Sequence, residues 1–386
     1  MSAAILPGAT LGVLGSGQLG RMFAIAARRL GYRIEVYSPD QNSPAGEVAN
    51  REWVGAYDDF DRLAQFAKEC DVVTLEFENV SVSAVHAIEK YAPVRPGANV
   101  LHTAQHRSRE KTWLHSQGIP TAPFAIVRSE ADLVSAMSKP GIDGQGILKT
   151  ASWGYDGKGQ IRVRSTDDLG VAWKSLNTDE AVLEGIVDFD RELSVIGVRS
   201  PQGDFRVYGP MHNIHKNHIL DVSICPPSSL DMQTKGQAVL ICRQIMEGLD
   251  AIGILCVELF VRKNGQLVVN ELAPRPHNSG HLTIDAFRSC QFEQQVRAVC
   301  GLPLGSTEQL RPAAMANLLG DVWEAPGGPN WLTVLAMPNV KLHLYGKAEP
   351  RLGRKMGHLT ALAETPEMAE DLARKARERL WTKQHD

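Results

Sequence analysis

A predicted β-hairpin over residues 254–272 constrains the fold of this chain more than any other stretch of its sequence. Two runs rich in β-forming residues flank Asn264-Gly265. This dipeptide is a strong hairpin signal, because a type I′ turn needs positive φ at both central positions. A two-residue loop here places Glu258 directly opposite Glu271. The other face of the two strands is expected to be core, formed by Leu255, Val257, Leu259, Val261, Val268 and Leu272.

The pairing of Glu258 with Glu271 predicts a metal site. Directly opposed side chains have Cβ atoms about 5 Å apart, and like charges placed this way destabilise a sheet. A hard divalent cation, Mg²⁺ or Mn²⁺, suits two carboxylates that are completed by substrate phosphates. The alternative is that one glutamate is exposed or bonded to a neighbouring lysine, or that a bulge shifts the register.

The segment after Glu271 stops alternating and carries a group of polar side chains, namely Arg275, His277, Asn278 and Ser279. Two prolines stiffen this segment, which suits groups that must be held in place beside a metal. A solvated surface loop is the alternative interpretation.

A glycine-rich loop, GVLGSGQLG over residues 12–20, follows an apolar run and precedes a helical pattern. Gly15, Gly17 and Gly20 match the spacing G-x-G-x-x-G, which predicts an anion site at the N-terminus of a helix. The pattern does not identify the anion. A nicotinamide dinucleotide, with Glu35 as a ribose ligand, is one of the alternatives.

A second glycine-rich stretch, GYDGKGQ over residues 154–160, does not have the spacing of a P-loop. It predicts a flap between two strands whose backbone N–H groups fold over phosphates, with Lys149 and Lys158 adding positive charge. An ordinary hairpin turn is the alternative.

The order of the predicted elements indicates three domains. Strands at 11–14, 33–37 and 71–77 alternate with helices in the first hundred residues, which predicts a doubly wound parallel sheet. A helix at 106–117 opens an α+β segment, and short strands follow Pro312 before a final helix at 366–380. The expected domains span residues 1–105, 106–310 and 311–386.

Composition excludes several classes of protein. A net charge of −3 argues against binding to nucleic acid through bulk electrostatics. No apolar run reaches the roughly 18 residues of a membrane span, and no signal peptide is evident. The six cysteines lack C-x-x-C spacing, so we expect buried thiols in a cytoplasmic protein.

Four motifs together resemble the ATP-grasp superfamily and, within it, the N5-carboxyaminoimidazole ribonucleotide synthetase family of purine biosynthesis. They are GQLGRM (17–22), GYDGKGQ (154–160), NELAPRPHNSGH (270–281) and GRKMGH (353–358). The resemblance spans nearly the whole chain in the order of the family. It implies a Rossmann-like N-terminal domain, a central ATP-grasp domain and a small β-rich C-terminal domain. Trp153 departs from the small residue usual ahead of GYDGKGQ.

The resemblance implies the residues that bind ATP. Arg107 and Lys149 would contact the phosphates beneath the flap, Glu184 would accept from the adenine amino group, and Glu192 would hold the ribose. The full implied set is Arg107, Lys149, Gly154, Tyr155, Asp156, Gly157, Lys158, Gly159, Gln160, Glu184, Gly185, Ile186, Val187, Glu192, His215, Asn270 and Glu271. The hairpin register predicts that Asn270 points away from Glu271, so its role is through the backbone or the strand twists there.

The resemblance also implies a site for 5-aminoimidazole ribonucleotide, which the first glycine loop would face in place of a dinucleotide. A basic cluster in the C-terminal segment could hold the ribose 5′-phosphate, with a solvated turn as the alternative. The implied substrate residues are Gln18, Leu19, Glu76, Asn79, Tyr155, Arg275, Asn278, Ser279, Lys347, Arg354 and Lys355.

The implied reaction is carboxylation driven by ATP and bicarbonate. Carboxyphosphate forms, ADP and phosphate are released, and the product is N5-carboxyaminoimidazole ribonucleotide. Arg275, His277 and Lys149 are the expected catalytic residues, with Mg²⁺ or Mn²⁺ on Glu258 and Glu271, and with neither nicotinamide nor flavin. A homodimer is expected from the resemblance. The alternatives are another ATP-grasp ligase, such as a formate-dependent glycinamide ribonucleotide transformylase, a nicotinamide oxidoreductase, or a nucleotide sensor.

Overall fold

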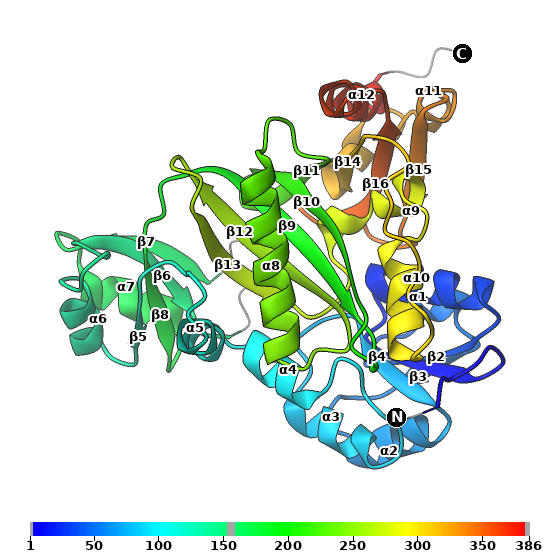
Figure 1. Ribbon diagram of the computed structural model, residues 1–386, viewed down its shortest axis with the longest axis horizontal. Helices are drawn as coiled ribbons and strands as arrows, with labels where there is room; N and C mark the ends of the chain where they lie inside the picture. Colours follow the sequence, from blue (N-terminus) through cyan, green and yellow to red (C-terminus); the bar gives the residue numbers. More distant parts are fainter. Residues whose placement is uncertain (1–2, 153–158, 383–386) are drawn as a thin grey trace.

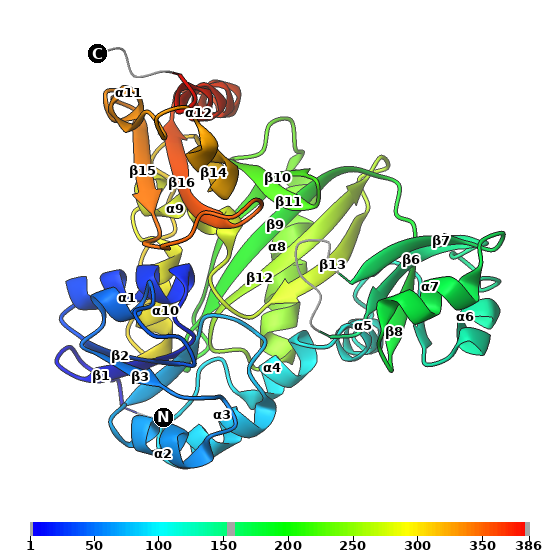
Figure 2. The same cartoon turned by 180° about the vertical axis from the view of Figure 1, so that it is seen from behind.

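The chain folds into three β-sheets with helices packed around them (Figure 1). The computed structural model describes residues 3–152 and 159–382. A large sheet runs through the centre, with the C-terminal strands at one of its ends. The N-terminal sheet lies toward that end and the small sheet lies toward the other, as Figure 2 shows from behind. This mixed architecture confirms the predicted fold class.

The N-terminal sheet is parallel and has the strand order β3-β2-β1-β4. Helices cover both of its faces, so its strands consist largely of apolar residues. The strands are β1 (Thr10–Leu14), β2 (Arg33–Ser38), β3 (Arg51–Val54) and β4 (Val72–Leu75). The helices are α1 (Gln18–Arg29), η1 (Gly46–Val48), α2 (Phe60–Lys68), α3 (Val82–Glu89) and α4 (Ala98–Ala104).

The small sheet is antiparallel, with the order β5-β8-β6-β7. Two capped helices pack on it, with the side chains of Ser129 and Asp168 accepting from first-turn amides. Its strands are β5 (Phe124–Val127), β6 (Gln145–Thr150), β7 (Gln160–Arg164) and β8 (Ala181–Gly185). Its helices are α6 (Glu130–Ala136) and α7 (Leu169–Leu176), and α5 (Arg107–Ser116) precedes them.

The large sheet has eight strands in the order β13-β12-β9-β10-β11-β14-β16-β15, and every pair in it is antiparallel. It continues without a break across residues 310 and 311, because β11 pairs with β14. The strands are β9 (Phe189–Arg199), β10 (Phe205–Lys216), β11 (Ile219–Cys225), β12 (Gly253–Arg262), β13 (Leu267–Ala273), β14 (Ala313–Leu319), β15 (Val340–Leu344) and β16 (Lys355–Leu362).

Helices bury both faces of this sheet. α8 (Met232–Gly248) covers one face of β9, β12 and β13, and α12 (Pro366–Arg379) covers β14 and β16. α10 (Gln291–Val299) packs between the large sheet and α1, so Phe292 shares a core with Phe23. The remaining short helices are η2 (Asn278–Gly280), α9 (Thr283–Ala286), η3 (Gly320–Glu324) and α11 (Trp331–Leu335).

The hairpin of β12 and β13 confirms the pairing of Glu258 with Glu271, but the predicted turn is wrong. The loop has three residues: the amide of Arg262 donates to Gln266 O, and only Gly265 has positive φ, at 81°. This moves the register near the turn by one residue. A bulge then restores it.

The extra residue of the bulge is Asn270, because Leu259 pairs with Val269 whereas Glu258 pairs with Glu271. Side chains therefore do not alternate strictly between the two faces at Asn270. The prediction that Asn270 points away from Glu271 assumed strict alternation, so it does not apply. Val268 pairs with Phe260 instead of lying in the core beneath α8, where Leu267 and Val269 take its place.

The helices and strands that the sequence predicts are confirmed to within two residues at most ends. The three domain boundaries stay predictions. None of the helices formed by the described residues combines the length and apolarity needed to cross a lipid bilayer. All six cysteines are free thiols and only Cys290 is not fully buried, which confirms the expectation that they form no disulfide.

Candidate functional site

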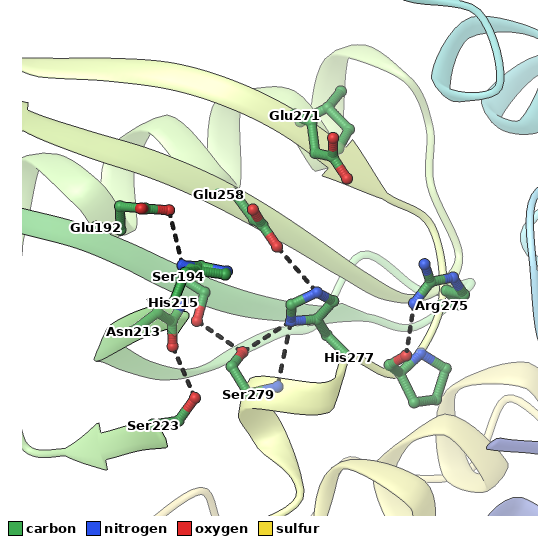
Figure 3. A network of polar contacts seen from close by, with 12 residues as sticks. Glu192, Ser194, Asn213, His215, Ser223, Glu258, Glu271, Arg275, His277 and Ser279 are labelled. Atoms are coloured by element: carbon green, nitrogen blue, oxygen red, sulfur yellow. Dashed lines mark hydrogen bonds and ion pairs between the residues drawn. The ribbon is translucent and has the colours of Figure 1, made fainter. Parts of the chain in front are cut away.

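Glu258 and Glu271 project from neighbouring strands on the face of the large sheet that α8 does not cover (Figure 3). Their flanking residues Val257 and Leu272 pack beneath α8, so alternation turns both carboxylates to the opposite side. The Glu258 side chain is 15% exposed and that of Glu271 is 36% exposed. The two acids therefore share one partly open surface.

A chain of hydrogen bonds begins at Glu258. His277 Nε2 lies 3.0 Å from Glu258 Oε1, and His277 Nδ1 lies 2.8 Å from Ser279 Oγ (Figure 3). The Ser279 amide donates to Nδ1, so the ring proton belongs on Nε2 and faces Glu258. Ser194 Oγ donates in turn to Ser279 Oγ at 2.7 Å. This network fixes the imidazole of His277 beside the proposed metal ligand.

Glu271 is paired with the first residue of α5. Arg107 Nη1 lies 3.3 Å from Glu271 Oε2, and the Arg107 amide donates to Ala151 O at 2.7 Å. Two residues assigned to ATP by resemblance thus meet, and one of them also contacts Ala151.

The carboxylate of Glu184 lies between two buried lysines. Lys149 Nζ is 2.9 Å from Glu184 Oε2, and Lys111 Nζ is 3.7 Å from the same atom. Burial acts to raise the pKa of Glu184, but the charges of Lys111 and Lys149 outweigh it and lower this pKa to about 2. Glu184 is only 3% exposed, so this ion-pair cluster lies inside the protein.

Glu192 lies next to His215 on the neighbouring strand. His215 Nδ1 is 3.1 Å from Glu192 Oε2 (Figure 3). Burial acts to lower the pKa of His215, but its hydrogen bond to Glu192 and the charges of Glu192 and Glu258 raise it overall. The expected ribose carboxylate therefore lies on the same sheet surface as the expected metal ligands.

Arg275 forms a bidentate ion pair with Glu78. Its Nε is 2.6 Å from Glu78 Oε2 and its Nη2 is 3.1 Å from Glu78 Oε1. Burial acts to raise the pKa of Glu78, but the charge of Arg275 and its hydrogen bonds hold this pKa below the ordinary value. The pair joins the loop after β4 to the loop after β13, and sequence reasoning did not single out Glu78.

The first glycine loop binds a carboxylate of the chain itself. Glu76 accepts hydrogen bonds from the amides of Gly17 and Gly20, the latter at 2.6 Å. A Cβ at Gly15 would lie 2.2 Å from Glu76 Cγ, so glycine is required there by close approach as well as by its φ of 106°. The anion that the spacing predicted is therefore Glu76 in this structure.

The other half of the dinucleotide hypothesis also lacks support. Glu35 is buried, and its Oε2 accepts from Trp53 Nε1 at 2.6 Å. Its carboxylate faces the core, which argues against the role of a ribose ligand.

Residues assigned to the ribonucleotide come from all three parts of the chain. Asn79 and Glu78 line a cavity together with Arg107 and Glu271, whereas Gln18 and Leu19 open α1 beside Glu76. Asn278 has its amide nitrogen and oxygen buried without a hydrogen-bond partner among the described residues. A polar ligand would satisfy this group.

Two of the three C-terminal basic residues, Lys347 and Lys355, act on carboxylates of the site, whereas Arg354 contacts Glu349. Lys347 Nζ donates to Lys355 O at 2.8 Å, and Arg354 Nη1 donates to Glu349 O at 2.8 Å. Burial raises the pKa of Glu76 against the opposing charge of Lys347. Burial also acts to raise the pKa of Glu258, but the hydrogen bond with His277 and nearby positive charge, that of Lys355 included, lower it to about 2. The structure thus brings Lys347 and Lys355 together between the glycine loop and the acidic pair.

The remaining assigned positions lie on or near the small sheet. Gly185 ends β8 and its amide donates to Pro123 O, while Ile186 is exposed and Val187 half-buried. Gly159 directly precedes β7, and Gln160 is its first residue. The predictions for Trp153, Gly154, Tyr155, Asp156, Gly157 and Lys158 concern positions outside the described residues.

Two buried charged residues on α5, Glu110 and Lys111, were missed by sequence reasoning. Burial raises the pKa of Glu110 to about 8, against the opposing charge of Lys111. Glu110 lines the same cavity as Glu271. A signal was present, since both charges fall on the face of a predicted helix that carries Arg107.

The donor set fits a hard divalent cation that is shared with phosphates. Across residues 3–152 and 159–382, no group of three or more His, Cys, Asp or Glu side chains is arranged to hold a metal alone. Two carboxylates from paired strands, with the remaining ligands supplied by phosphates and water, is the arrangement usual for Mg²⁺. The residues present are therefore compatible with Mg²⁺ on Glu258 and Glu271.

Family models match three successive parts of the chain. A ribonucleotide synthetase preATP-grasp domain matches residues 8–105, an ATP-grasp domain matches 112–292, and a phosphoribosylaminoimidazole carboxylase C-terminal domain matches 313–372.

Individual proteins match over nearly the whole length. The N5-carboxyaminoimidazole ribonucleotide synthase of Brucella melitensis is 44% identical, covering 92% of this chain and 97% of its own. The crystal structure of an N5-carboxyaminoimidazole ribonucleotide synthetase with ADP superposes with a TM-score of 0.91 at 40% identity, covering 97% of this chain and 98% of its own.

The Aspergillus clavatus N5-carboxyaminoimidazole synthase in complex with ADP and 5-aminoimidazole ribonucleotide superposes with a TM-score of 0.85 at 28% identity, covering 96% and 98% of the two chains. With its three domains, its paired acids and these relatives, the chain belongs to the N5-carboxyaminoimidazole ribonucleotide synthase family of ATP-grasp ligases.

Proposed function

We propose that this chain carboxylates 5-aminoimidazole ribonucleotide with bicarbonate and ATP, using Mg²⁺ held by Glu258 and Glu271. Formation of N5-carboxyaminoimidazole ribonucleotide at the expense of ATP is the reaction of its family in purine biosynthesis. The observation that carries the proposal is the register of β12 and β13, which sets Glu258 opposite Glu271 beside Arg275 and His277.

ATP would lie between the small and large sheets. Glu184 would receive the adenine amino group, Glu192 would bind the ribose, and Lys149 and Arg107 would neutralise phosphates. In the structure these cations pair with Glu184 and Glu271 at 2.9 Å and 3.3 Å. Nucleotide binding would therefore exchange internal ion pairs for contacts with the phosphates.

When bound, Mg²⁺ would neutralise charge on the transferred phosphoryl group, which needs positioning and electrostatic stabilisation more than a covalent nucleophile. Glu258 and Glu271 would hold the ion. In the structure His277 contacts Glu258. When Glu258 turns to the metal, the contact of His277 with Ser279 would keep the imidazole in place.

Bicarbonate would bind at Arg275 and attack the γ-phosphorus, giving carboxyphosphate and ADP. A guanidinium has five N–H donors, so Arg275 can hold Glu78 and still donate to a planar anion. Glu78 thereby fixes the orientation of the Arg275 guanidinium. Because carboxyphosphate hydrolyses readily, a closed site that excludes water is required.

The exocyclic amine of the ribonucleotide would then attack the activated carbon, directly or as CO₂, with phosphate as the leaving group. The amine must lose a proton as the N–C bond forms. His277 is the candidate to orient the intermediate or to exchange this proton. Asn278, Ser279 and the glycine loop would position the acceptor, and Lys347, Arg354 and Lys355 would bind its 5′-phosphate.

Two wider inferences accompany the proposal. Six unpaired cysteines suit a reducing compartment, so we place the protein in the cytoplasm. We also propose a homodimer, which light scattering coupled to size exclusion would test.

The experiment that tests the function measures phosphate release from ATP while bicarbonate and 5-aminoimidazole ribonucleotide are omitted in turn. Full turnover should require both. Equal turnover with glycinamide ribonucleotide as acceptor, or turnover that does not depend on bicarbonate, would contradict the proposal.

A further inference from the structure

Strand β13 is the outer edge of the eight-stranded sheet, and it carries the bulge at Asn270. A bulge leaves backbone groups without ladder partners, and on its outer side β13 meets the isolated bridge of Val269 to Thr121 instead of a further strand. The peptides on either side of Glu271 therefore need partners from elsewhere in the chain.

Helix α5 supplies these partners through two side chains. Glu110 Oε2 accepts from the Leu272 amide at 2.9 Å. Lys111 Nζ donates to Asn270 O at 2.7 Å and more weakly to Val269 O at 3.4 Å. Glu110 and Lys111, which we call the α5 clamp, thus hold the backbone immediately before and after Glu271.

The same helix face also reaches the Glu271 side chain. Arg107 precedes Glu110 by three residues and Lys111 by four. Its guanidinium lies 3.3 Å from the Glu271 carboxylate. Residues at this spacing lie on one side of a helix. One face of α5 therefore contacts both the backbone and the carboxylate of the proposed metal ligand.

Burial makes the clamp an unusual way to cover a strand edge. Glu110 is 2% exposed and Lys111 is fully buried. Burying two ionisable side chains carries a large desolvation cost, which raises the pKa of Glu110 to about 8, and an apolar pair would avoid this cost. An apolar pair would, however, leave the Leu272 N–H and the Asn270 C=O without partners.

We propose that Glu110 and Lys111 are positioning residues that fix the bulge at Asn270 and thereby direct Glu271 toward the metal. The part of this inference that concerns the metal rests on the proposed function, whereas the part that concerns the backbone does not. Lys111 also lies 3.7 Å from Glu184, so Glu110 is the cleaner residue to test.

The test compares Glu110→Met with Glu110→Gln. Methionine removes the acceptor for Leu272, whereas glutamine keeps an oxygen in its place. Hydrogen exchange of the segment around Leu272 is followed in the protein without nucleotide or metal. Binding of Mn²⁺ to the protein with ADP is measured by electron paramagnetic resonance.

We expect Glu110→Met to accelerate exchange at Leu272 and to weaken Mn²⁺ binding by about tenfold or more, as residues that orient a metal ligand commonly do. Glu110→Gln should restore both readouts to near the wild-type values. Lys111→Met provides a second variant if Glu110→Met does not fold, with the same expected changes.

A matched control is Gln294→Leu on α10. Gln294 is fully buried, and it likewise holds backbone groups, donating to Gly305 O at 2.8 Å and accepting from Gly305 N at 2.9 Å. The Gln294→Leu variant should therefore have a lower free energy of unfolding than the wild type but unchanged Mn²⁺ binding. An equal loss of Mn²⁺ binding in this control would mean that the Glu110 effect is only general destabilisation, and would overturn the proposal.

Glu271→Gln separates the two ways of failing. If Mn²⁺ binding is insensitive to Glu271→Gln, the proposed metal site is wrong, and exchange at Leu272 still decides whether the clamp holds the bulge. If Glu271→Gln abolishes Mn²⁺ binding but Glu110→Met changes neither exchange nor binding, the clamp is wrong and the metal site stands.

Discussion

Glu258 and Glu271 lie directly opposite one another, yet each carboxylate has a different partner: His277 lies 3.0 Å from Glu258 and Arg107 lies 3.3 Å from Glu271. The repulsion that their pairing would cause is therefore relieved within the chain. Both partners come from segments that also border the proposed phosphate site, so a bound metal nucleotide would replace contacts that already exist.

Glu258→Gln and Glu271→Gln should each reduce ATP turnover by about a hundredfold or more, because an amide binds a hard cation much more weakly than a carboxylate does. Steady-state turnover and Mn²⁺ titration measure the effect. Glu247→Gln, which alters an exposed ion pair with Arg243 on α8, is the control and should behave as wild type. Turnover by either site variant close to that of the control would refute the metal assignment.

Arg275→Ala should abolish turnover that depends on the ribonucleotide and should also lower stability. Truncation leaves the half-buried Glu78 carboxylate without its partner. Breaking a fully buried pair costs about 3–5 kcal/mol, so the loss of stability here should be smaller than that. Denaturant unfolding measures the second effect. The double variant Arg275→Ala/Glu78→Ala should regain part of the stability but none of the turnover, which separates the structural role from the catalytic one. Unimpaired turnover in Arg275→Ala would count against any role in the reaction.

Protonation of Glu184 should weaken the fold at low pH. Its pKa is about 2 in the folded protein, compared with an ordinary value of 4.5, so its charged form is favoured by folding. The stabilisation is fully present above pH 4.5 and is lost as the pH falls toward 2. Unfolding free energies of wild type and Glu184→Gln, measured between pH 7 and the acid limit of folding, should converge as the pH falls. A constant difference would show that the carboxylate is not held by Lys111 and Lys149.

Gly15→Ala should be far more harmful than Gly8→Ala. Both glycines have φ near 100°, at 106° and 98°, so both variants incur a similar backbone strain of about 1 kcal/mol. Only at Gly15 would the new Cβ meet another group, Glu76 Cγ at 2.2 Å, whereas nothing lies within 4 Å of a Cβ at Gly8. The free energy of chemical unfolding and the rate of ribonucleotide-dependent turnover should both fall sharply for Gly15→Ala but not for Gly8→Ala. Equal effects of the two variants would mean that the Glu76 contact is unimportant.

Features that depend on near neighbours in the chain could be predicted from the sequence. Alternating apolar runs and turn residues located β1, α1, β2 and most of the other elements, and the two β-runs around Gly265 placed Glu258 opposite Glu271. That last prediction was correct although the turn was not, because the one-residue shift at the loop is cancelled by the bulge at Asn270. A local pattern cannot reveal a bulge that is stabilised by another helix.

Family resemblance placed the site residues in order along the chain, but it could not show their present partners. Glu78 on Arg275, Lys111 on Glu184 and the α5 clamp on β13 join residues that lie 73 to nearly 200 positions apart. Such pairs form only when sheets and helices pack, since the cost of burying each charge is offset by a partner that the local sequence does not contain.

The sequence by itself determined which segments become strands and helices and which glycines allow tight approach, because these depend on short-range sterics and hydrophobic periodicity. Only the tertiary structure decided that the glycine loop receives Glu76 and that the two acids contact His277 and Arg107. The physical reason is that a buried charge takes whichever opposite charge or N–H group the packed domains bring within a few ångströms.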